Sequence, residues 1–328
     1  MRCGTGHAVA VAGVARDMTS KVVQYRRYGG PEVLELVDRE DPTPGPGQVR
    51  LAVRAAAVNP LDWKLRGGAM ASGDAPGAPQ VPGYDVAGTV DALGEGVTAF
   101  AVGDEVVGKA TGGGYAEEAV ADVRALVRKP AEVGWETAAA LPVVATTAYR
   151  ALALLGLGEG DHTGTTIVID GASGAVGVVA VQLAVARGAT VIGSAGEAHQ
   201  DEVRALGATP VVYGEGLADR VRAVAPDGVD LGFDTSGYGG LRDLVALTGS
   251  PEKAITIADY AGAQELGVTF TSGGDPDDES RALAEALGLL AEGRLRAPTV
   301  VTYPLAEAGR AQDDNRTRRV AGKLVLLP

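Results

Sequence analysis

The chain has 328 residues, enough for two packed domains, and its 46% hydrophobic and 22% charged residues exclude wholesale disorder. A net charge of −13 argues against a general nucleic-acid binder and offers no attraction to anionic membranes. Cys3 is the single cysteine and only three histidines accompany it, so an internal disulfide is excluded and no protein-held metal is expected. No apolar run reaches the about 18 residues of a membrane span. We therefore expect a cytoplasmic protein.

Residues 1–17 differ in character from the rest of the chain. They contain a short apolar stretch, Ala8–Ala15, behind Arg2. A secretory signal is one interpretation, but the stretch is short and diluted by alanine and glycine. The other interpretation, which we adopt, is a disordered tail with the fold beginning near Met18.

The chain up to about residue 130 shows strand patterns separated by turns rich in glycine and proline. Lys21–Tyr25 and Val33–Val37 alternate in hydrophobicity on either side of Gly29-Gly30-Pro31, which predicts a hairpin. Further short strands are expected at Gln48–Arg54, Asp85–Leu93 and Glu105–Gly108. These patterns predict a mostly β domain.

After Pro142 the chain alternates between strands and helices. The expected strands are Thr166–Asp170, Thr190–Gly193, Val229–Asp234 and Lys253–Ala258. The expected helices are Val178–Arg187, Gln200–Leu206 and Arg281–Glu292. This alternation predicts a doubly wound parallel sheet. The final strands, Val300–Tyr303 and Lys323–Leu327, are expected to return to the first domain.

A glycine-rich turn joins the first of these apolar strands to the helix after it. Small residues at such a place permit a tight turn and a close approach of backbone to a pyrophosphate, and the helix N-terminus offers free N–H groups. The context of strand before and helix after predicts dinucleotide binding. The expected cofactor contacts are Gly171, Ala172, Ser173, Gly174, Ala175, Val176 and Gly177.

The end of the second strand bears on the choice of dinucleotide. NAD sites usually carry an acidic residue there, and this chain has Ser194 and Gly196 with no carboxylate before Glu197. That absence favours NADPH, although no Lys or Arg lies between Thr190 and Glu202 to pair with a 2′-phosphate. Glu197 would repel that phosphate if it pointed inward, so NADH is not excluded.

Several motifs in one order carry a family resemblance over about residues 20–328. They are Asn59-Pro60-Leu61-Asp62 with Arg66-Gly67, Pro82-Gly83-Tyr84-Asp85 with Gly88, Phe100 with Gly103-Asp104, Gly114-Tyr115-Ala116-Glu117, Leu141-Pro142, Thr147-Ala148, Gly171 to Gly177 and Gly322-Lys323. Together they resemble the zinc-free quinone oxidoreductase (ζ-crystallin-like) branch of the medium-chain dehydrogenase/reductase superfamily.

The resemblance implies a GroES-like, mostly β catalytic domain formed by residues 18–143 and 296–328, with a Rossmann domain at 144–295 between them. It implies reduction of quinones, enones or enoyl thioesters with NADPH, commonly by homodimers. Asn59 stands near the place of a zinc-ligating cysteine, and Gly83-Tyr84-Asp85 replaces the histidine-bearing motif, so no zinc is expected. Gly196-Glu197-Ala198-His199 departs from the basic or amide-bearing run usual in close relatives.

Reduction of an enone without a metal needs a placed nicotinamide, a hydrogen bond to the carbonyl oxygen and a proton for the adjacent carbon. By motif match Asn59 is the candidate for the floor of the cleft, and Tyr84, Lys64 and Tyr115 are candidate donors. We expect Asp62 and Arg66 to form a buried structural pair. The remaining expected cofactor contacts are Thr147, Ser194, Gly196, His199 and Tyr213.

Three functions follow from these observations. The first is an NADPH-dependent quinone or enone reductase, and the second is an enoyl reductase acting on a polyketide-like or carrier-bound intermediate. The third is a family member without redox activity that binds a ligand or catalyses a non-redox step such as cyclisation. The altered loop after the second strand motivates the third function, while the intact Gly174 and Gly177 argue against it.

Overall fold

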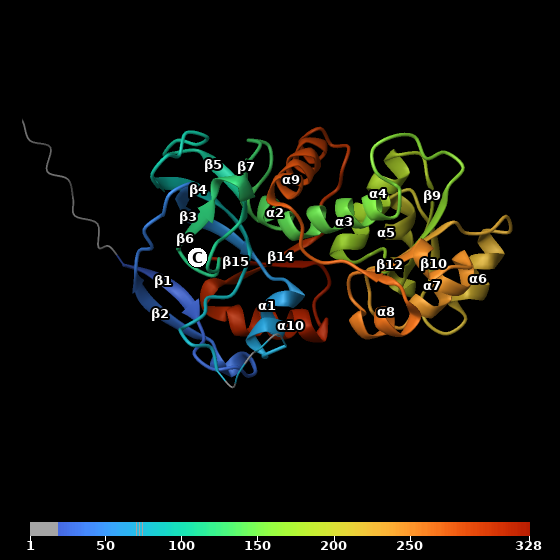
Figure 1. Cartoon of the computed structure of the whole chain (residues 1–328), viewed down its shortest axis with the longest axis horizontal. Coiled ribbons are helices and arrows are strands. Elements are labelled where there is room, and N and C mark those ends of the chain that lie inside the picture. Colours follow the sequence, from blue (N-terminus) through green and yellow to red (C-terminus); the bar gives the residue numbers. More distant parts are fainter. Residues whose placement is uncertain (1–18, 70, 72, 74) are drawn as a thin grey trace, which may run out of the picture.

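The computed structural model describes residues 19–69, 71, 73 and 75–328. The expected N-terminal tail, with Cys3 and His7, lies outside these residues. The described residues form two large sheets that lie side by side, with helices between and around them (Figure 1).

The first sheet has seven strands in the order β14-β15-β3-β4-β5-β7, with β6 also paired to β3. A separate antiparallel hairpin, β1–β2, confirms the one expected around Gly29-Gly30-Pro31, with a short 3-10 helix at Pro31–Val33 in its connection. The strands are β1 (Thr19–Gln24), β2 (Glu35–Glu40), β3 (Gln48–Ala57), β4 (Asp85–Leu93), β5 (Glu105–Lys109), β6 (Glu118–Asp122), β7 (Leu126–Arg128), β14 (Val300–Pro304) and β15 (Lys323–Leu327).

The last strand of the chain lies inside this first sheet, between β14 and β3. Val325 and Leu326 of β15 pair with Ala57 and Ala56 of β3 in antiparallel register. The C-terminus consequently lies in the same half of the molecule as β1 to β7, although the whole parallel sheet comes between them in sequence (Figure 1). This return brings the two ends of the described chain to one core.

The second sheet is parallel, with six strands in the order β10-β9-β8-β11-β12-β13. Numbered from the first of them, this order is 3-2-1-4-5-6, the doubly wound arrangement expected of a Rossmann sheet. The strands are β8 (Thr166–Asp170), β9 (Thr190–Ala195), β10 (Thr209–Val212), β11 (Leu231–Asp234), β12 (Ala254–Thr256) and β13 (Thr269–Phe270). The predicted fold class, a GroES-like β domain with a Rossmann sheet, is confirmed.

The described residues contain more helices than the sequence predicted. They are α1 (Pro60–Arg66), α2 (Trp135–Ala139), α3 (Pro142–Leu154), α4 (Ala175–Ala186), α5 (Gln200–Ala205), α6 (Leu217–Val224), α7 (Leu241–Thr248), α8 (Tyr260–Leu266), α9 (Pro276–Ala291) and α10 (Ala308–Thr317). The helix expected from Arg281 begins earlier, at Pro276, because Asp275 accepts a hydrogen bond from the Asp277 N–H and caps it. Helix α3 was not predicted, since it is buried among both halves and lacks a polar face.

No helix in the described part of the chain is long and apolar enough to cross a membrane.

Candidate active site

The glycine-rich turn lies at the carboxyl end of β8, where β8 and β11 are neighbours in the middle of the parallel sheet. Gly171 has a φ of +84°, a left-handed conformation that favours glycine. A side chain at Gly177 would overlap the carbonyl oxygen of Gly171, so the helix packs directly on the turn. Gly174 precedes α4 and no side chain caps that helix, which leaves its first N–H groups free for an anion.

A buried polar cluster lies beneath this turn. The carboxylate of Asp170, at the end of β8, accepts hydrogen bonds from the hydroxyls of Ser194 and Ser236, the latter at 2.5 Å. Ser194 also accepts the Gly171 N–H at 3.1 Å and is fully buried. Its hydroxyl is therefore committed to the protein, and the expected contact of Ser194 with the cofactor is available only to its backbone. Burial raises the pKa of Asp170.

Sequence reasoning missed Asp170 as part of this site. The sequence feature that could have indicated it is a carboxylate at the end of an otherwise apolar strand, directly before the first glycine of the turn. Asp234, at the end of the adjacent β11, is a second such residue, and it accepts the N–H groups of Ser236 and Gly237 at 2.9 and 2.8 Å. The two carboxylates therefore hold the loops that follow β8 and β11, the neighbouring strands at which the strand order of the sheet reverses.

The residues expected to contact the adenosine end lie after β9 and β10. Tyr213 is half exposed, and its ring packs close to Gly196: a Cβ atom added to that glycine would lie 3.4 Å from the ring edge. The Nδ1 atom of His199 is 3.0 Å from Glu202, and Glu197 is exposed. Sequence reasoning missed Arg220, whose guanidinium donates to the carbonyls of residues 212–215 beside Tyr213. Only the folded chain brings this cation, on α6, next to the β10 turn.

Asn59 lies at the centre of a buried polar cluster in the half of the molecule that contains the first sheet, which is the predicted catalytic half. It precedes α1, where its backbone N–H donates to Asp62 at 2.8 Å, and its Nδ2 donates to Asp85 at 3.0 Å. The ammonium of Lys323, on β15, donates to Asn59 Oδ1 and lies 3.8 Å from the Asp85 carboxylate. These side chains are nearly or fully buried, so the cluster fixes the orientation of the Asn59 amide.

Burial sets the ionisation of this cluster. It is the largest influence on each group, raising the pKa of Asp85 and lowering that of Lys323, while their mutual attraction opposes both shifts. Burial raises the pKa of Asp62 to about 7, against the opposing hydrogen bonds from the Asn59 N–H and the Tyr115 hydroxyl. Two carboxyl groups and one ammonium group are thus buried together away from water. The protonation state of each group therefore depends on the charges of the other two.

Two sequence-based expectations about this cluster are wrong. Asp62 and Arg66 do not pair: Asp62 accepts the Tyr115 hydroxyl at 2.8 Å, and Arg66 donates to Gln312 at 2.7 Å. These side chains leave α1 toward different neighbours, and the partner of Arg66 comes from α10, a helix the sequence did not reveal. Tyr115 is fully buried with its hydroxyl on Asp62, so it is a packing residue rather than a donor to substrate.

The other expected site residues come from three segments that carry or contact members of this cluster. Tyr84 directly precedes β4 and is 36% exposed, with its pKa raised first by burial and then by Asp62. Thr147 is buried on α3, and that helix is tied to the cluster because Asp85 accepts the Val143 N–H at 3.1 Å. Lys64 is exposed on α1, with its ammonium 5.7 Å from the centre of the Trp63 ring.

One of the basic residues near the C-terminus connects the two halves of the molecule. Arg318 ends α10 in a left-handed conformation (φ 52°) and donates to the carbonyl of Ser236 at 3.0 Å. Its guanidinium also stacks 3.7 Å from the centre of the Tyr238 ring. Since Ser236 also binds Asp170, this arginine joins the catalytic half to the loops beside the glycine-rich turn.

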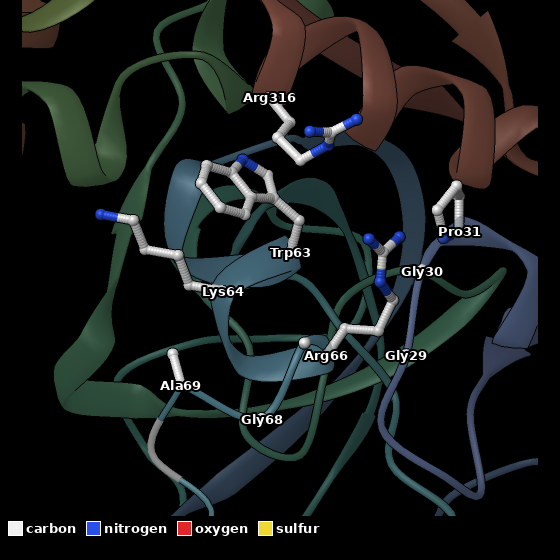
Figure 2. A pocket seen from close by; sticks show the side chains of 10 residues that line it. Gly29, Gly30, Pro31, Trp63, Lys64, Arg66, Gly68, Ala69 and Arg316 are labelled. Carbon is white, nitrogen blue, oxygen red and sulfur yellow. The ribbon is translucent and has the colours of Figure 1, made fainter.

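A pocket of about 410 Å³ opens at the C-terminal end of α1 (Figure 2). Trp63, Lys64 and Arg66 line it from α1, Pro31 lines it from the hairpin connection and Arg316 from α10. The Trp63 ring is held in place by a hydrogen bond from its Nε1 to Asn315 Oδ1 at 2.9 Å. The pocket therefore joins three segments that are far apart in sequence.

Comparison with known proteins agrees with this arrangement. Residues 45–131 match the family described as the alcohol dehydrogenase GroES-like domain, and residues 175–250 match the zinc-binding dehydrogenase family. The chain is 33% identical to a quinone oxidoreductase of Lama guanicoe, over 94% of this chain and 97% of the relative. It is also 33% identical to a quinone oxidoreductase of Pseudomonas aeruginosa, over 94% of this chain and 100% of the relative.

Solved structures give the same picture. A mycobacterial quinone oxidoreductase superposes with a TM-score of 0.79 at 28% identity, covering 94% of this chain and 100% of that one. A mycobacterial protein solved in complex with NADPH superposes with a TM-score of 0.81 at 28% identity and the same coverage.

Proposed function

The chain belongs to the quinone oxidoreductase branch of the medium-chain dehydrogenase/reductase superfamily and is an oxidoreductase, and we infer that it uses a nicotinamide cofactor, as the neighbour solved with NADPH supports. From this premise we propose that it is an NADPH-dependent, zinc-independent reductase that transfers hydride to a quinone or an α,β-unsaturated carbonyl compound. The observation that carries the proposal is the glycine-rich turn at the crossover of the parallel sheet, together with the uncapped N-terminus of α4.

The turn fits the diphosphate of a dinucleotide. Its glycines leave the backbone accessible, and the free N–H groups of α4 with the helix dipole favour an anion there. The residues that would hold the cofactor are those expected from the sequence: Gly171, Ala172, Ser173, Gly174, Ala175, Val176, Gly177, Thr147, Gly196, His199, Tyr213 and the backbone of Ser194. Bound NADPH would supply the hydride for the β-carbon of an enone or for a quinone.

The protein's own residues would bind and polarise the substrate. The buried network of Lys323 and Asp85 holds the Asn59 amide in one orientation at the base of α1, which limits the reorganisation needed during the reaction. We assign Lys64 and Tyr84 as the groups that donate a hydrogen bond to the substrate carbonyl oxygen as negative charge develops there. One proton from solvent then adds to the α-carbon of the enolate left by hydride transfer to an enone, or to an oxygen of the anion left by hydride transfer to a quinone, which completes the two-electron reduction.

Zinc independence rests on residue chemistry at the corresponding positions. By the motif resemblance, Asn59 stands near the place of the zinc-ligating cysteine and Gly83-Tyr84-Asp85 replaces the histidine-bearing motif, and an amide and a phenol are poor substitutes for thiolate and imidazole. The Asn59 amide is in addition engaged by Asp85 and Lys323. A homodimer and a cytoplasmic location remain predictions from the family resemblance and the sequence.

An enoyl reductase for a polyketide-like or carrier-bound intermediate remains the second candidate, because the same residues would polarise a thioester carbonyl. The test is a titration of the purified protein with NADPH and with NADH, followed by cofactor fluorescence. Micromolar NADPH binding, with quinone- or enone-dependent oxidation of NADPH, is the expected result. Failure to bind either dinucleotide would contradict both reductase functions and leave a redox-inactive protein.

A further inference from the structure

The pocket at the end of α1 is lined by three basic residues and by no acidic one, in a chain that carries 42 acidic residues. Lys64 and Arg66 have no carboxylate within ion-pair distance among residues 19–69, 71, 73 and 75–328. Arg316 is 2.7 Å from Asp313, which it shares with Arg319. The lining therefore has unneutralised positive charge.

Arg66 is a buried cation in this pocket with a hydrogen-bond donor that the described residues leave unsatisfied. Its side chain is 2% exposed, and a buried guanidinium is costly unless its donors are satisfied. One terminal nitrogen donates to Gln312, but its Nε has no hydrogen-bond partner within the described residues. Burial lowers the pKa of Arg66, and the charge of Glu32, which lies beyond ion-pair distance, opposes that shift without reversing it. A buried cation with unused donors is a place for an anion.

The ring of Trp63 separates the two arginines of the pocket from Lys64. Figure 2 shows the guanidinium groups of Arg66 and Arg316 on the side of Trp63 that faces Pro31, and the Lys64 ammonium on the opposite side. Lys64 is one of the groups we assign to the substrate carbonyl. A molecule with an anionic group between the two arginines would lie along the flat, anchored indole with its other end toward Lys64.

We propose that Arg66 and Arg316 bind a small anionic group, a phosphate or a carboxylate, carried by the substrate of this enzyme. Guanidinium groups suit such oxygens because they present paired donors in one plane. A pocket of about 410 Å³ accepts such a group together with a few adjoining atoms. The anion site itself is independent of redox activity; its assignment to the substrate rests on the proposed function.

The first test is calorimetric titration of the whole protein with inorganic phosphate, at an ionic strength held constant with sodium chloride. We expect millimolar binding that Arg316→Ala weakens at least fivefold. The matched control is Arg310→Ala, an exposed arginine on the same helix that pairs with Glu307 and does not line the pocket. Equal weakening in both variants, or no phosphate binding to the unmodified protein, would overturn the proposal.

The same titration with excess NADPH separates this pocket from the cofactor site. An unchanged phosphate affinity supports the proposal, whereas competition would place the phosphate on the glycine-rich turn and overturn it. Arg316→Glu provides a second variant: the position is about half exposed, and the substitution places a negative charge where the anion would bind. Phosphate binding should be lost in that variant, and retained binding would contradict the site.

The substrate assignment is tested with two aryl enones that differ only by a ring carboxylate. We expect the carboxylate-bearing enone to have the higher kcat/KM and Arg316→Ala to remove that preference, while Arg310→Ala keeps it. No preference in the unmodified enzyme would overturn the assignment. If neither enone is reduced, the proposed function is contradicted, and the phosphate titration still decides the anion site on its own.

Discussion

The glycine-rich turn and the Asn59 cluster are built in opposite ways. The turn is contiguous in sequence: Gly171 and Gly174 lie between β8 and α4, and Gly177 lies in the first turn of α4. The Asn59 cluster joins α1, the start of β4, the end of the chain and the buried Tyr115, over separations of up to 264 residues. A local motif tolerates little change within itself, whereas an assembled buried cluster depends on the charge balance among distant residues.

The largest effect is expected at Lys323. Lys323→Met removes the ammonium and leaves Asp85 buried without its cationic partner, which should cost about 3–5 kcal/mol of unfolding free energy. Urea denaturation measures this cost. The double variant Lys323→Met with Asp85→Asn removes both charges and should recover much of the loss. Equal instability of the single and double variants would show that packing, rather than charge balance, governs the cluster.

The next largest expected effect is a pH dependence that Asp62 gives to the Asn59 cluster. The pKa of Asp62 is about 7 in the folded chain, against 3.8 for an aspartate in water, so the folded state binds more protons between these values. The unfolding free energy should therefore fall as pH rises from about 4 to about 7, by up to a few kcal/mol from this group. Denaturation of the protein and of Asp62→Asn across this range isolates the slope. A variant that keeps the full slope would assign it to other residues.

The next prediction is that one added methyl group in the glycine-rich turn disturbs its packing. Gly177→Ala places a side-chain carbon against the Gly171 carbonyl, so we expect a loss of about 1–3 kcal/mol in stability. Because the turn and the helix must separate, NADPH affinity should fall about tenfold or more. Gly158→Ala is the matched control, since a side chain there meets open space. Unchanged NADPH binding by Gly177→Ala would argue against this turn as the cofactor site.

The smallest effect is expected at the exposed loop after β9. Glu197→Gln removes a negative charge near the place of a 2′-phosphate, and water screens that charge strongly. NADPH affinity should rise about two- to fivefold relative to NADH, and the gain should shrink at high salt. Binding titrations with both dinucleotides measure the ratio. A gain that is equal for NADH and NADPH would show that Glu197 does not sense the 2′-phosphate.

Sequence analysis recovered features whose cause is local. The strands β4 and β8 begin and end at the expected residues, since alternation and turn residues mark them. The doubly wound parallel sheet followed from the alternation of strands and helices, whereas the GroES-like fold of the other half followed from the family resemblance. Helices α2 and α3 were missed because their alanine-rich, largely buried sequences carry little amphipathic signal.

The sequence by itself determined the two-sheet architecture, the glycine-rich turn and the family of the protein, because short-range patterns and ordered motifs specify them. Only the tertiary structure decided the partners of buried polar groups. Asp62 binds Tyr115 rather than Arg66, Asn59 is held from the far end of the chain, and Arg66 and Arg316 meet in one pocket. The physical reason is that a buried charge selects whichever partner the packing brings near, and packing depends on contacts between segments that no local pattern encodes.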